Sequence, residues 1–519
     1  MKKRTAGIMT LTLLTTMLLA ACGGGSSGTG EEPTSEQQPP AKSGETSKEE
    51  SEATKEPMVI NLFREGPALP APDQDIILPE LNKALHMDLK YNTAPTEYAQ
   101  QLNVKIAGGT PPDVFGVNKV QMEQFAKQGM LLDLTPYLKD MNHLTPENGF
   151  TESHMKKGVV DGKQYAIPYR PLIPVQTTYW VRQDWLDQLG LEKPTTLDEL
   201  KAVAKAFVER DPDGNGKHDT LGITGNGFNG TLSPIFAAFG VAAPGQMMIR
   251  DNQVVYSTAL PETAQAVEFI KGMIEEKLID PEFLTNNGLM HQEKAFKGQA
   301  GIVYAHWAHI KRPDMVEKMN AINPDQVWTQ LDAMTGPGGK FADFYDEGGT
   351  NLRLVIPKSL ESQPEKVAKV LEYINYVSGG EGQTLVNYGI QDRNYKVVDG
   401  KIDIIEEMVT EMGHASIHQI TGRIEMEYLR TKFGDLEPYF AFTNQLPYIS
   451  VYTNFASTPE GVNPADKSKF EEEEMIKFIH GKRPIAEMDA FLQTLKDTFQ
   501  LDKYISEADK ALKDLGFIK

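Results

Sequence analysis

The chain has 519 residues, a formal net charge of −20 and one cysteine, Cys22. A chain of this length can form two or three domains, each with its own hydrophobic core. A globally acidic chain is a poor nucleic-acid binder, because neutralising phosphate needs clustered Lys and Arg, and a single cysteine excludes an internal disulfide. Beyond the N-terminus, no stretch reaches the ~18 consecutive apolar residues of a membrane-spanning helix.

The N-terminus has the three parts of an export signal. Residues 1–4 are basic, residues 8–20 are apolar and Thr-rich, and residues 19–22 read LAAC. This pattern predicts a lipoprotein signal peptide over residues 1–21, with Cys22 left to carry lipid such as palmitate. An ordinary secretory signal with an incidental cysteine is the alternative. We expect a protein on the extracellular face of the cell membrane, held by its lipid anchor alone because an acidic chain is not drawn to anionic lipid.

Residues 22–57 form a low-complexity segment rich in Gly, Ser, Glu and Lys. The segment has almost nothing to bury, which predicts a disordered tether between the lipid and the fold. Gly24, Ser26 and Gly28 match the GxSxG of serine hydrolases. That motif needs a strand before it and a helix after it, so the match here is chance.

Strands and helices alternate from Met58 onward. The apolar pattern predicts strands over 58–63, 88–91 and 113–117, and helices over 74–86 (interrupted near Pro79), 96–107 and 120–128. This order is typical of a parallel sheet with crossover helices. Ligands of such sheets lie beyond the carboxyl ends of the strands, and Arg64 and Asn118 fall at those positions.

A second α/β unit is expected further along the chain. Strand-like segments occupy 165–169, 177–181, 221–224, 301–305 and 352–356, and helices are expected over 184–189, 195–209, 263–276 and 364–377. Thr196 and Glu199 form a capping box. The GxGxxG at 225–230 is interpreted as a glycine-rich loop rather than a nucleotide site. The C-terminal third is mostly helical, and the acidic run 471–474 is interpreted as a solvated helix start.

The loop that begins at Asp211 has the spacing of a calcium-binding loop. Oxygen-bearing side chains stand at positions 1, 3, 5 and 9, glycine stands at position 6, and position 7 offers a backbone carbonyl. These residues are Asp211, Asp213, Asn215, Asp219, Gly216 and Lys217. Gly222 replaces the usual glutamate at position 12. A structural Ca²⁺ is the hypothesis, and an acidic turn held by Asx hydrogen bonds is the alternative.

Aromatic side chains stand beside polar ones in several expected loops, as at Tyr169-Arg170, Tyr179-Trp180, His306-Trp307 and Arg393-Asn394-Tyr395. Sugars present apolar C–H faces that stack on aromatic rings and hydroxyls that bond polar groups. Carbohydrate binding is therefore one interpretation. Core packing is the other, and it applies to Tyr179 and Trp307 in particular.

Signatures of common enzymes are missing: there is no HExxH, P-loop, CxxC or second thiol. Paired carboxylates of a glycosidase need only be close in space, so sequence does not exclude them. We predict a protein that is not an enzyme.

Several segments together resemble the extracellular solute-binding protein family 1, the sugar-binding lipoproteins of ABC transporters. They are LNVKIAGGTPPDVFGVN at 102–118, FAKQGMLLDLTPYL at 125–138, DGKQYAIPY at 161–169, YWVRQDWLDQLGLEKPTTLDELKAVAKAF at 179–207 and FKGQAGIVYAHWAHI at 296–310. Segments 381–401 and 478–497 look like the large oligosaccharide-binding branch of the Bacillus and Paenibacillus type. The Asp211 loop resembles the calcium loop of alginate-binding proteins, which continue with an acid where this chain has Thr220.

The resemblance implies an α/β fold of the periplasmic-binding-protein type II, with two hinged lobes and a helix-rich C-terminal part. It places lobe 1 at 58–170 plus 345–390 and lobe 2 at 171–344 plus 391–519. Trp307 would be a cleft aromatic, and Tyr169-Arg170 and residues 389–395 would lie near hinge crossings. The expected ligand contacts are Arg64, Asn118, Tyr169, Arg170, Trp180, His306, Trp307, Arg353, Arg393 and Tyr395.

The resemblance also implies a monomeric receptor that captures an oligosaccharide between its lobes and delivers it to ABC permease subunits. Two other classes stay open. One is a surface polysaccharide hydrolase or lyase, and the other is a receptor for a peptide or an organic anion. An anionic ligand, including a uronate-bearing oligosaccharide, is favoured if Arg64, Arg170, Arg353 and Arg393 converge.

Overall fold

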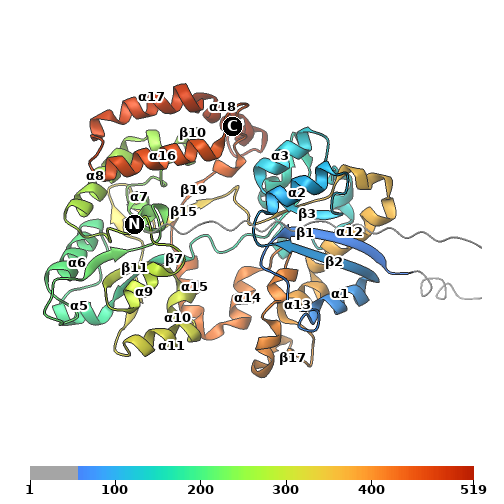
Figure 1. The fold of residues 1–519 in the computed structure, drawn as a ribbon, viewed down its shortest axis with the longest axis horizontal. Helices are drawn as coiled ribbons and strands as arrows, with labels where there is room; N and C mark the ends of the chain where they lie inside the picture. Colours follow the sequence, from blue (N-terminus) through green and yellow to red (C-terminus); the bar gives the residue numbers. More distant parts are fainter. Residues whose placement is uncertain (1–55) are drawn as a thin grey trace, which may run out of the picture. The chain divides into compact units, whose positions relative to one another are not determined.

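Two β-sheets, each with its own core, organise the part of the chain that the structure describes, residues 56–519 (Figure 1). The structure is a computed structural model. The predicted signal peptide and Cys22 lie outside the described residues, as does the tether up to residue 55. No helix within residues 56–519 is both long and apolar enough to span a membrane.

The first sheet has five strands and carries the first lobe. Its spatial order is β2 (Met87–Ala94), β1 (Met58–Glu65), β3 (Val114–Val117), β16 (Arg353–Val355) and β6 (Ala166–Pro168). β1 runs parallel to β2 and β3, as the alternating pattern predicts, whereas β16 is antiparallel to β3 and β6. The carboxyl ends of β1, β2 and β3 therefore share one edge of this sheet.

Helices cover both faces of the first sheet (Figure 1). One face packs against α1 (Ile77–Leu85) and α12 (Pro364–Val377), and the other against α2 (Tyr98–Ala107) and α3 (Lys119–Lys127). Alternation along β1 sets this division, since Ile60 and Leu62 face the first pair and Phe63 faces the second. The adjoining short elements are α4 (Glu152–Met155), β4 (Val159–Val160), β5 (Lys163–Gln164) and α13 (Gly380–Tyr388).

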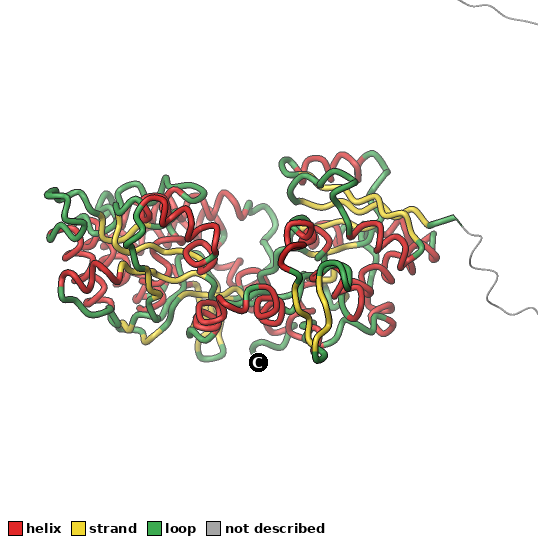
Figure 2. Tube along the Cα trace, turned by 90° about the horizontal axis from the view of Figure 1, so that it is seen from below, coloured by secondary structure: helices red, strands yellow, loops and turns green. Residues whose placement is uncertain are grey.

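The second sheet has four strands, in the order β12 (Trp328–Gln330), β7 (Thr177–Arg182), β11 (Ala300–His306) and β8 (Leu221–Thr224). Helices lie on both sides of it (Figure 2). They are α5 (Gln183–Leu189), α6 (Leu197–Glu209), α7 (Asn229–Ala238), α8 (Pro261–Glu275), α9 (Met290–Phe296), α10 (Trp307–Lys311) and α11 (Pro313–Ile322). Thr196 and Glu199 form the predicted capping box at the start of α6.

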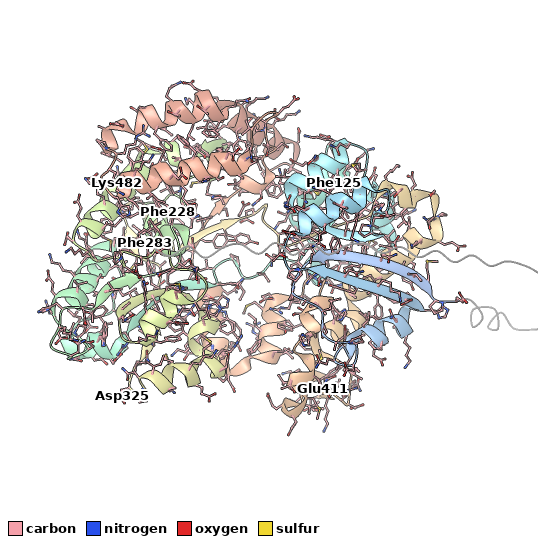
Figure 3. The ribbon with its side chains drawn as sticks, in the orientation of Figure 1. Phe125, Phe228, Phe283, Asp325, Glu411 and Lys482 are labelled. Atoms are coloured by element: carbon pink, nitrogen blue, oxygen red, sulfur yellow. The ribbon has the colours of Figure 1, made fainter. Side chains whose placement is uncertain are left out.

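The C-terminal helices extend the core of the second lobe. They are α16 (Pro464–Ile479), α17 (Met488–Phe499) and α18 (Leu501–Asp514). Phe478 and Phe491 pack with Phe228 and Phe283, which are labelled in Figure 3, in one core cluster. Two hairpins adjoin this lobe, β9 (Met247–Arg250) with β10 (Gln253–Tyr256) and β13 (Thr335–Gly336) with β14 (Gly339–Lys340).

The chain passes between the two sheets at residues 169–176 and 347–352. A parallel strand pair precedes the second passage, β15 (Asp343–Asp346) beside β19 (Tyr448–Val451). Lys157 Nζ donates to the Gly349 carbonyl oxygen at 2.8 Å and fixes the loop that follows β15.

Residues 391–444 contribute to both lobes. The elements here are β17 (Tyr395–Val398), β18 (Lys401–Ile404), α14 (Glu425–Lys432) and α15 (Glu437–Asn444). Met412, Ala415 and Ile420 pack in the core of the first sheet, while Tyr428 and Phe440 pack with side chains of the second sheet. The expected division at residues 390 and 391 stays a prediction, and this packing places residues 412–420 with the first lobe.

Two local expectations need correction. Helix α1 is not interrupted at Pro79, because it begins at Ile77 and Pro79 stands in its first turn, where no N–H is needed. The acidic run 471–474 is not a solvated helix start. Glu471 is 3% exposed in the middle of α16, where it pairs with Lys467 at 3.1 Å between Nζ and Oε2.

Candidate functional site

A cavity of about 770 Å³ lies at the carboxyl edge of the first sheet. Its lining comes from the ends of β1 and β3, the first turns of α2 and α3, and the segments at residues 169 and 350–353 that join the lobes. Volumes of this size suit a small ligand or part of a larger one. Arg64, Asn118, Tyr169 and Arg353 line this cavity, so the structure brings these four of the predicted contacts together.

Close packing of backbone shapes the floor of the cavity. The Tyr98 hydroxyl donates to the Gly116 carbonyl oxygen at 2.6 Å and to the Phe63 carbonyl oxygen at 3.2 Å, which ties α2 to β1 and β3. A Cβ at Gly116 would lie 2.4 Å from Cδ1 of Leu352. A larger residue at this position would therefore require the Leu352 side chain to move.

Asn118 is committed to holding α3. Its side chain accepts from the Gln121 N–H at 2.9 Å, and the Gln121 side chain accepts from the Asn118 N–H at 3.1 Å. This capping box orients the helix start toward the cavity. The Asn118 side chain is exposed there, so its amide N–H groups face solvent and are free for a ligand.

Arg353 lines the cavity, but it is buried and its guanidinium is already hydrogen-bonded within the chain. It is 3% exposed, and its Nε and Nη2 donate to the carbonyl oxygens of Lys157 and Gly348, both at 2.9 Å. Burial lowers its pKa to about 10, which leaves the guanidinium charged at neutral pH. The bond to Gly348 connects the first sheet to the loop after β15.

Tyr169 offers an unused hydroxyl to the cavity. Its backbone N–H donates to the Leu352 carbonyl oxygen and its carbonyl oxygen accepts from the Thr350 hydroxyl, both at 2.8 Å. The half-buried phenol makes no hydrogen bond with any residue from 56 to 519, and burial raises its pKa. A phenol fixed in this way can both stack and hydrogen-bond.

Arg170, next in the chain, lies in the interior of the first lobe. It is 2% exposed and donates to the carbonyl oxygens of Asn148, Ser378 and Gly422, the last at 2.8 Å. Its guanidinium also lies 4.4 Å from the centre of the Phe150 ring. Because these partners use its donors, we no longer count Arg170 among the candidate ligand contacts.

Trp180 and Trp307 are core side chains. Trp180 is fully buried and donates from Nε1 to the Ala305 carbonyl oxygen at 3.0 Å. Trp307 is 3% exposed, and its ring centre lies 5.4 Å from that of Phe440. Both belong to one apolar cluster of the second lobe. The core-packing interpretation therefore replaces the cleft interpretation for these two tryptophans.

Arg393 and Tyr395 lie away from the cavity. Arg393 is an exposed residue whose Nε pairs with Glu411 at 2.9 Å, and Glu411 is labelled in Figure 3. Tyr395 begins β17 and lines a separate hollow beside α13. The four arginines proposed from the sequence therefore do not converge, because only Arg64 and Arg353 reach the cavity.

His306 belongs to a histidine cluster at the end of β11. Its Nδ1 accepts from the Ala308 N–H at 3.0 Å, so its Nε2 carries the proton and donates to Gln176 Oε1 at 2.9 Å. Gln292 Nε2 lies 2.9 Å from Nδ1 of His309. Burial lowers the pKa of His306 and of the nearby His291 to about 4, so both imidazoles are neutral at pH 7.

Because the pKa values of His291 and His306 are lowered, we expect the protein to lose stability as pH falls. Their pKa values in the folded state lie below the ordinary value near 6.5, so the unfolded chain binds more protons between about pH 6.5 and 4. Each contributes a slope of at most about 1.4 kcal/mol per pH unit in that window. The buried Asp343 opposes this trend, because burial raises its pKa to about 6.

His306→Asn is expected to make the free energy of unfolding less dependent on pH, because the unfolded chain then takes up one proton fewer in this window. Asparagine keeps an acceptor for the Ala308 N–H but does not titrate. Urea unfolding at a series of pH values from 7 to 4 measures the slope. An unchanged slope in the variant would show that His306 protonates as readily in the folded chain as in the unfolded one.

The predicted calcium loop is held by its own side chains. Asn215 Nδ2 donates to Asp213 Oδ2 at 2.7 Å and to Asp219 Oδ1 at 3.0 Å, and Asp211 Oδ2 accepts from the Gly216 N–H at 2.9 Å. Asp211 Oδ1 is buried without a partner among the described residues. Burial, and then Asp211 itself, raises the pKa of Asp213.

The chemistry of this loop suits a hard cation, whereas its arrangement does not gather the carboxylates. Within residues 56–519, no group of three or more Asp, Glu, His or Cys side chains is placed to hold a metal ion. The Asn215 amide nitrogen stands between the carboxylates of Asp213 and Asp219. Rotation of that amide would present its oxygen to the same space.

Sequence reasoning missed several residues that line the cavity. They are Glu65, Glu97, Tyr98, Lys119, Thr350, Asn351, Ser416 and Asn454. The rule that ligands lie beyond strand ends applies equally to β2, and it would have found Glu97 and Tyr98. No local signal marks Ser416 and Asn454, which only the tertiary fold brings to this place.

Comparisons with known proteins agree with this architecture. The profile of the family described as bacterial extracellular solute-binding protein matches residues 66–384, more than half of the chain. The chain belongs to this family. It is 28% identical over 346 residues to lipoprotein LipO of Bacillus subtilis, covering 64% of this chain and 67% of LipO. It is also 25% identical over 370 residues to the B. subtilis polygalacturonan/rhamnogalacturonan-binding protein YtcQ, covering 69% and 70%.

A solved structure shows the same two-lobe fold. The substrate-binding protein FusA of Streptococcus pneumoniae, in complex with kestose, has a TM-score of 0.65 at 20% identity and covers 88% of this chain and 99% of FusA. FusA has also been solved as an EF-hand mutant bound to fructo-nystose. The α/β, two-lobed fold expected from the sequence is therefore confirmed, and YtcQ and FusA are named as binding proteins.

Proposed function

We propose that this chain is an extracellular, lipid-anchored receptor that binds an oligosaccharide and delivers it to an ABC importer. The carrying observation is the cavity at the carboxyl edge of the first sheet, where Arg64, Asn118 and Tyr169 present polar groups that the fold does not use. The named ligands of its relatives support a sugar but differ among themselves, since YtcQ is named for polygalacturonan and rhamnogalacturonan and FusA for fructo-oligosaccharides.

In this proposal the second lobe also contacts the bound oligosaccharide. Strand β11 ends at His306, which together with Gln176 forms a neutral hydrogen-bonding pair next to the passage between the lobes. Both ring nitrogens of His306 are already bonded, so the imidazole holds the Gln176 amide, whose second N–H and second oxygen lone pair suit a sugar hydroxyl. Ligand contacts from both lobes would stabilise a closed form, which the permease subunits recognise. Residues 58–170 with 345–390 would form lobe 1, extended by 412–420, and the protein would act as a monomer.

Tyr169→Phe tests the sugar site. The variant removes only a hydroxyl that makes no hydrogen bond within the described chain, so stability should change little. A lost hydrogen bond to a sugar weakens binding by about 1 kcal/mol, or roughly fivefold. Titration calorimetry against neutral and acidic oligosaccharides measures the affinity.

Tyr165→Phe is the matched control, because Tyr165 is half-buried nearby and does not line the cavity. Equal affinities in both variants would remove Tyr169 from the site. The absence of binding to every sugar, or release of reducing ends from a polymer, would contradict the receptor proposal.

We propose in addition that the Asp211 loop binds a structural Ca²⁺, held by Asp211, Asp213, Asn215, Asp219 and the Lys217 carbonyl oxygen. The spacing, the partnerless Asp211 Oδ1 and the EF-hand named for FusA support this site. A bound cation stabilises the folded state, by about 2.7 kcal/mol at 100 times its dissociation constant. Thermal unfolding with calcium and then with a chelator measures the shift.

Asp211→Asn is expected to abolish the calcium-dependent shift, whereas Asp325→Asn, in an exposed turn of the second lobe (Figure 3), should keep it. A shift of equal size in Asp211→Asn would move the site elsewhere. No shift in the unmodified protein would leave the loop as an acidic turn.

A further inference from the structure

The cavity at the edge of the first sheet contains a cation that the fold leaves without a partner. Arg64 lies near the end of β1 and lines this cavity. Its side chain makes no hydrogen bond or ion pair with any residue from 56 to 519, and the Nε atom is buried with no acceptor. Buried polar groups are nearly always bonded, so a guanidinium nitrogen left without a partner in the chain indicates a place for a ligand's acceptor.

The other cations that line the cavity are already paired. Lys119 lies 2.8 Å from Glu123 Oε1 and also donates to the Ala456 carbonyl oxygen. Arg353 donates to two backbone carbonyl oxygens. Among the cationic side chains that line it, Arg64 is therefore the one whose charge is free of partners within the described chain.

The start of α2 adds a second positive feature. The first turn, from Glu97 to Gln100, lines the cavity beside Arg64. No side chain caps this helix, and Gln101 is the first residue here whose N–H returns to a backbone carbonyl, that of Glu97 at 3.0 Å. The preceding N–H groups are open to a ligand, and the helix dipole favours an anion there. The start of α3, by contrast, is capped by the Asn118 side chain.

Two carboxylates, Glu65 and Glu97, also line the cavity. Both residues are exposed, so water and salt screen their charges. The Arg64 Nε, by contrast, is withdrawn from solvent. A single anionic group placed against Arg64 gains a charge-assisted hydrogen bond in that less polar setting, whereas a densely charged polymer would meet the two rim glutamates.

We infer that the cavity takes an oligosaccharide that carries a carboxylate, as a uronic acid residue does, with that carboxylate held by Arg64 and the open first turn of α2. This inference rests on the proposed function, because it names the kind of sugar bound at the same site. A planar carboxylate matches the fork of the guanidinium, and the neighbouring Tyr169 and Asn118 bond the hydroxyls of the ring.

The test compares an oligosaccharide that carries a single uronic acid residue with its methyl ester, in which a neutral ester replaces the carboxylate. Calorimetric titration of the protein should show the acid binding about tenfold or more tightly than its ester. Arg64→Gln should lower the affinity for the acid to about that for the ester. Arg430→Gln, which removes an exposed arginine paired with Glu437, should keep the preference.

Each other result has a definite meaning. Equal binding of acid and ester, or a preference that survives Arg64→Gln, overturns the inference and leaves the receptor function intact. Preference for a sulfated oligosaccharide over every uronate also overturns it, because sulfate is then the recognised anion. Failure of all sugars to bind overturns the inference and the proposed function together.

Discussion

Glu471→Ala is expected to lower the free energy of unfolding by about 3–5 kcal/mol, because it leaves Lys467 as an unpaired buried charge. Both side chains are nearly inaccessible, at 5% and 4% exposure. Glu471 Oε2 also accepts from the Tyr256 hydroxyl at 2.5 Å, and Oε1 accepts from Thr258. One substitution therefore breaks a network that joins α16 to the β10 region of the second lobe. Urea unfolding measures the change.

Glu472→Ala is the matched control, since Glu472 is an exposed residue one position along the same helix. It should change stability by less than about 0.5 kcal/mol. The double variant Lys467→Met with Glu471→Met should recover much of the loss, because it removes both buried charges. A loss for Glu471→Ala no larger than that of the control would mean that water reaches Lys467 in solution.

The order of elements could be predicted because it depends on local patterns. A mostly apolar run predicted β1, and helical patterns predicted α2 and α12, nearly to their ends. The capping box at Thr196 fixed the start of α6 from two residues alone. A capping box can be predicted from sequence because its two side chains bond backbone groups within one helical turn.

The burial of charged residues could not be predicted in the same way. The run of four glutamates at 471–474 looks solvated when read along the chain. Helical geometry instead turns Glu471 and Glu474 inward and leaves Glu472 and Glu473 exposed. The partners that make this burial tolerable, Tyr256 and Thr258, come from more than 200 positions earlier, a separation of 213 for Thr258.

The residues of the candidate site also differ in how far local sequence patterns could predict them. Arg64 and Asn118 were found because strand ends in a parallel sheet share an edge, and this rule needs only the order of elements. Trp307 also follows a strand, but it begins α10 and packs against Phe440, which no local pattern indicates. Position after a strand therefore identifies a loop but does not say whether the side chain faces solvent or core.

Arg170→Met is expected to destabilise the protein strongly while leaving ligand affinity unchanged. Three backbone carbonyl oxygens, of Asn148, Ser378 and Gly422, accept from this one guanidinium. Methionine fills part of the volume but leaves these buried oxygens without donors. At about 1–3 kcal/mol for each unsatisfied group, and with losses that do not add fully, a fall of about 3–5 kcal/mol is expected.

Two measurements separate this role from a ligand contact. Thermal unfolding without sugar should show the full loss, and calorimetry well below the unfolding midpoint should give the affinity of the unmodified protein. Arg170→Lys should recover little, because an ammonium cannot reach three acceptors from separate segments. Weakened sugar binding with undiminished stability would restore Arg170 to the cavity. The unchanged affinity expected here follows from geometry, since the residue next to Tyr169 in sequence points into the lobe while Tyr169 lines the cavity.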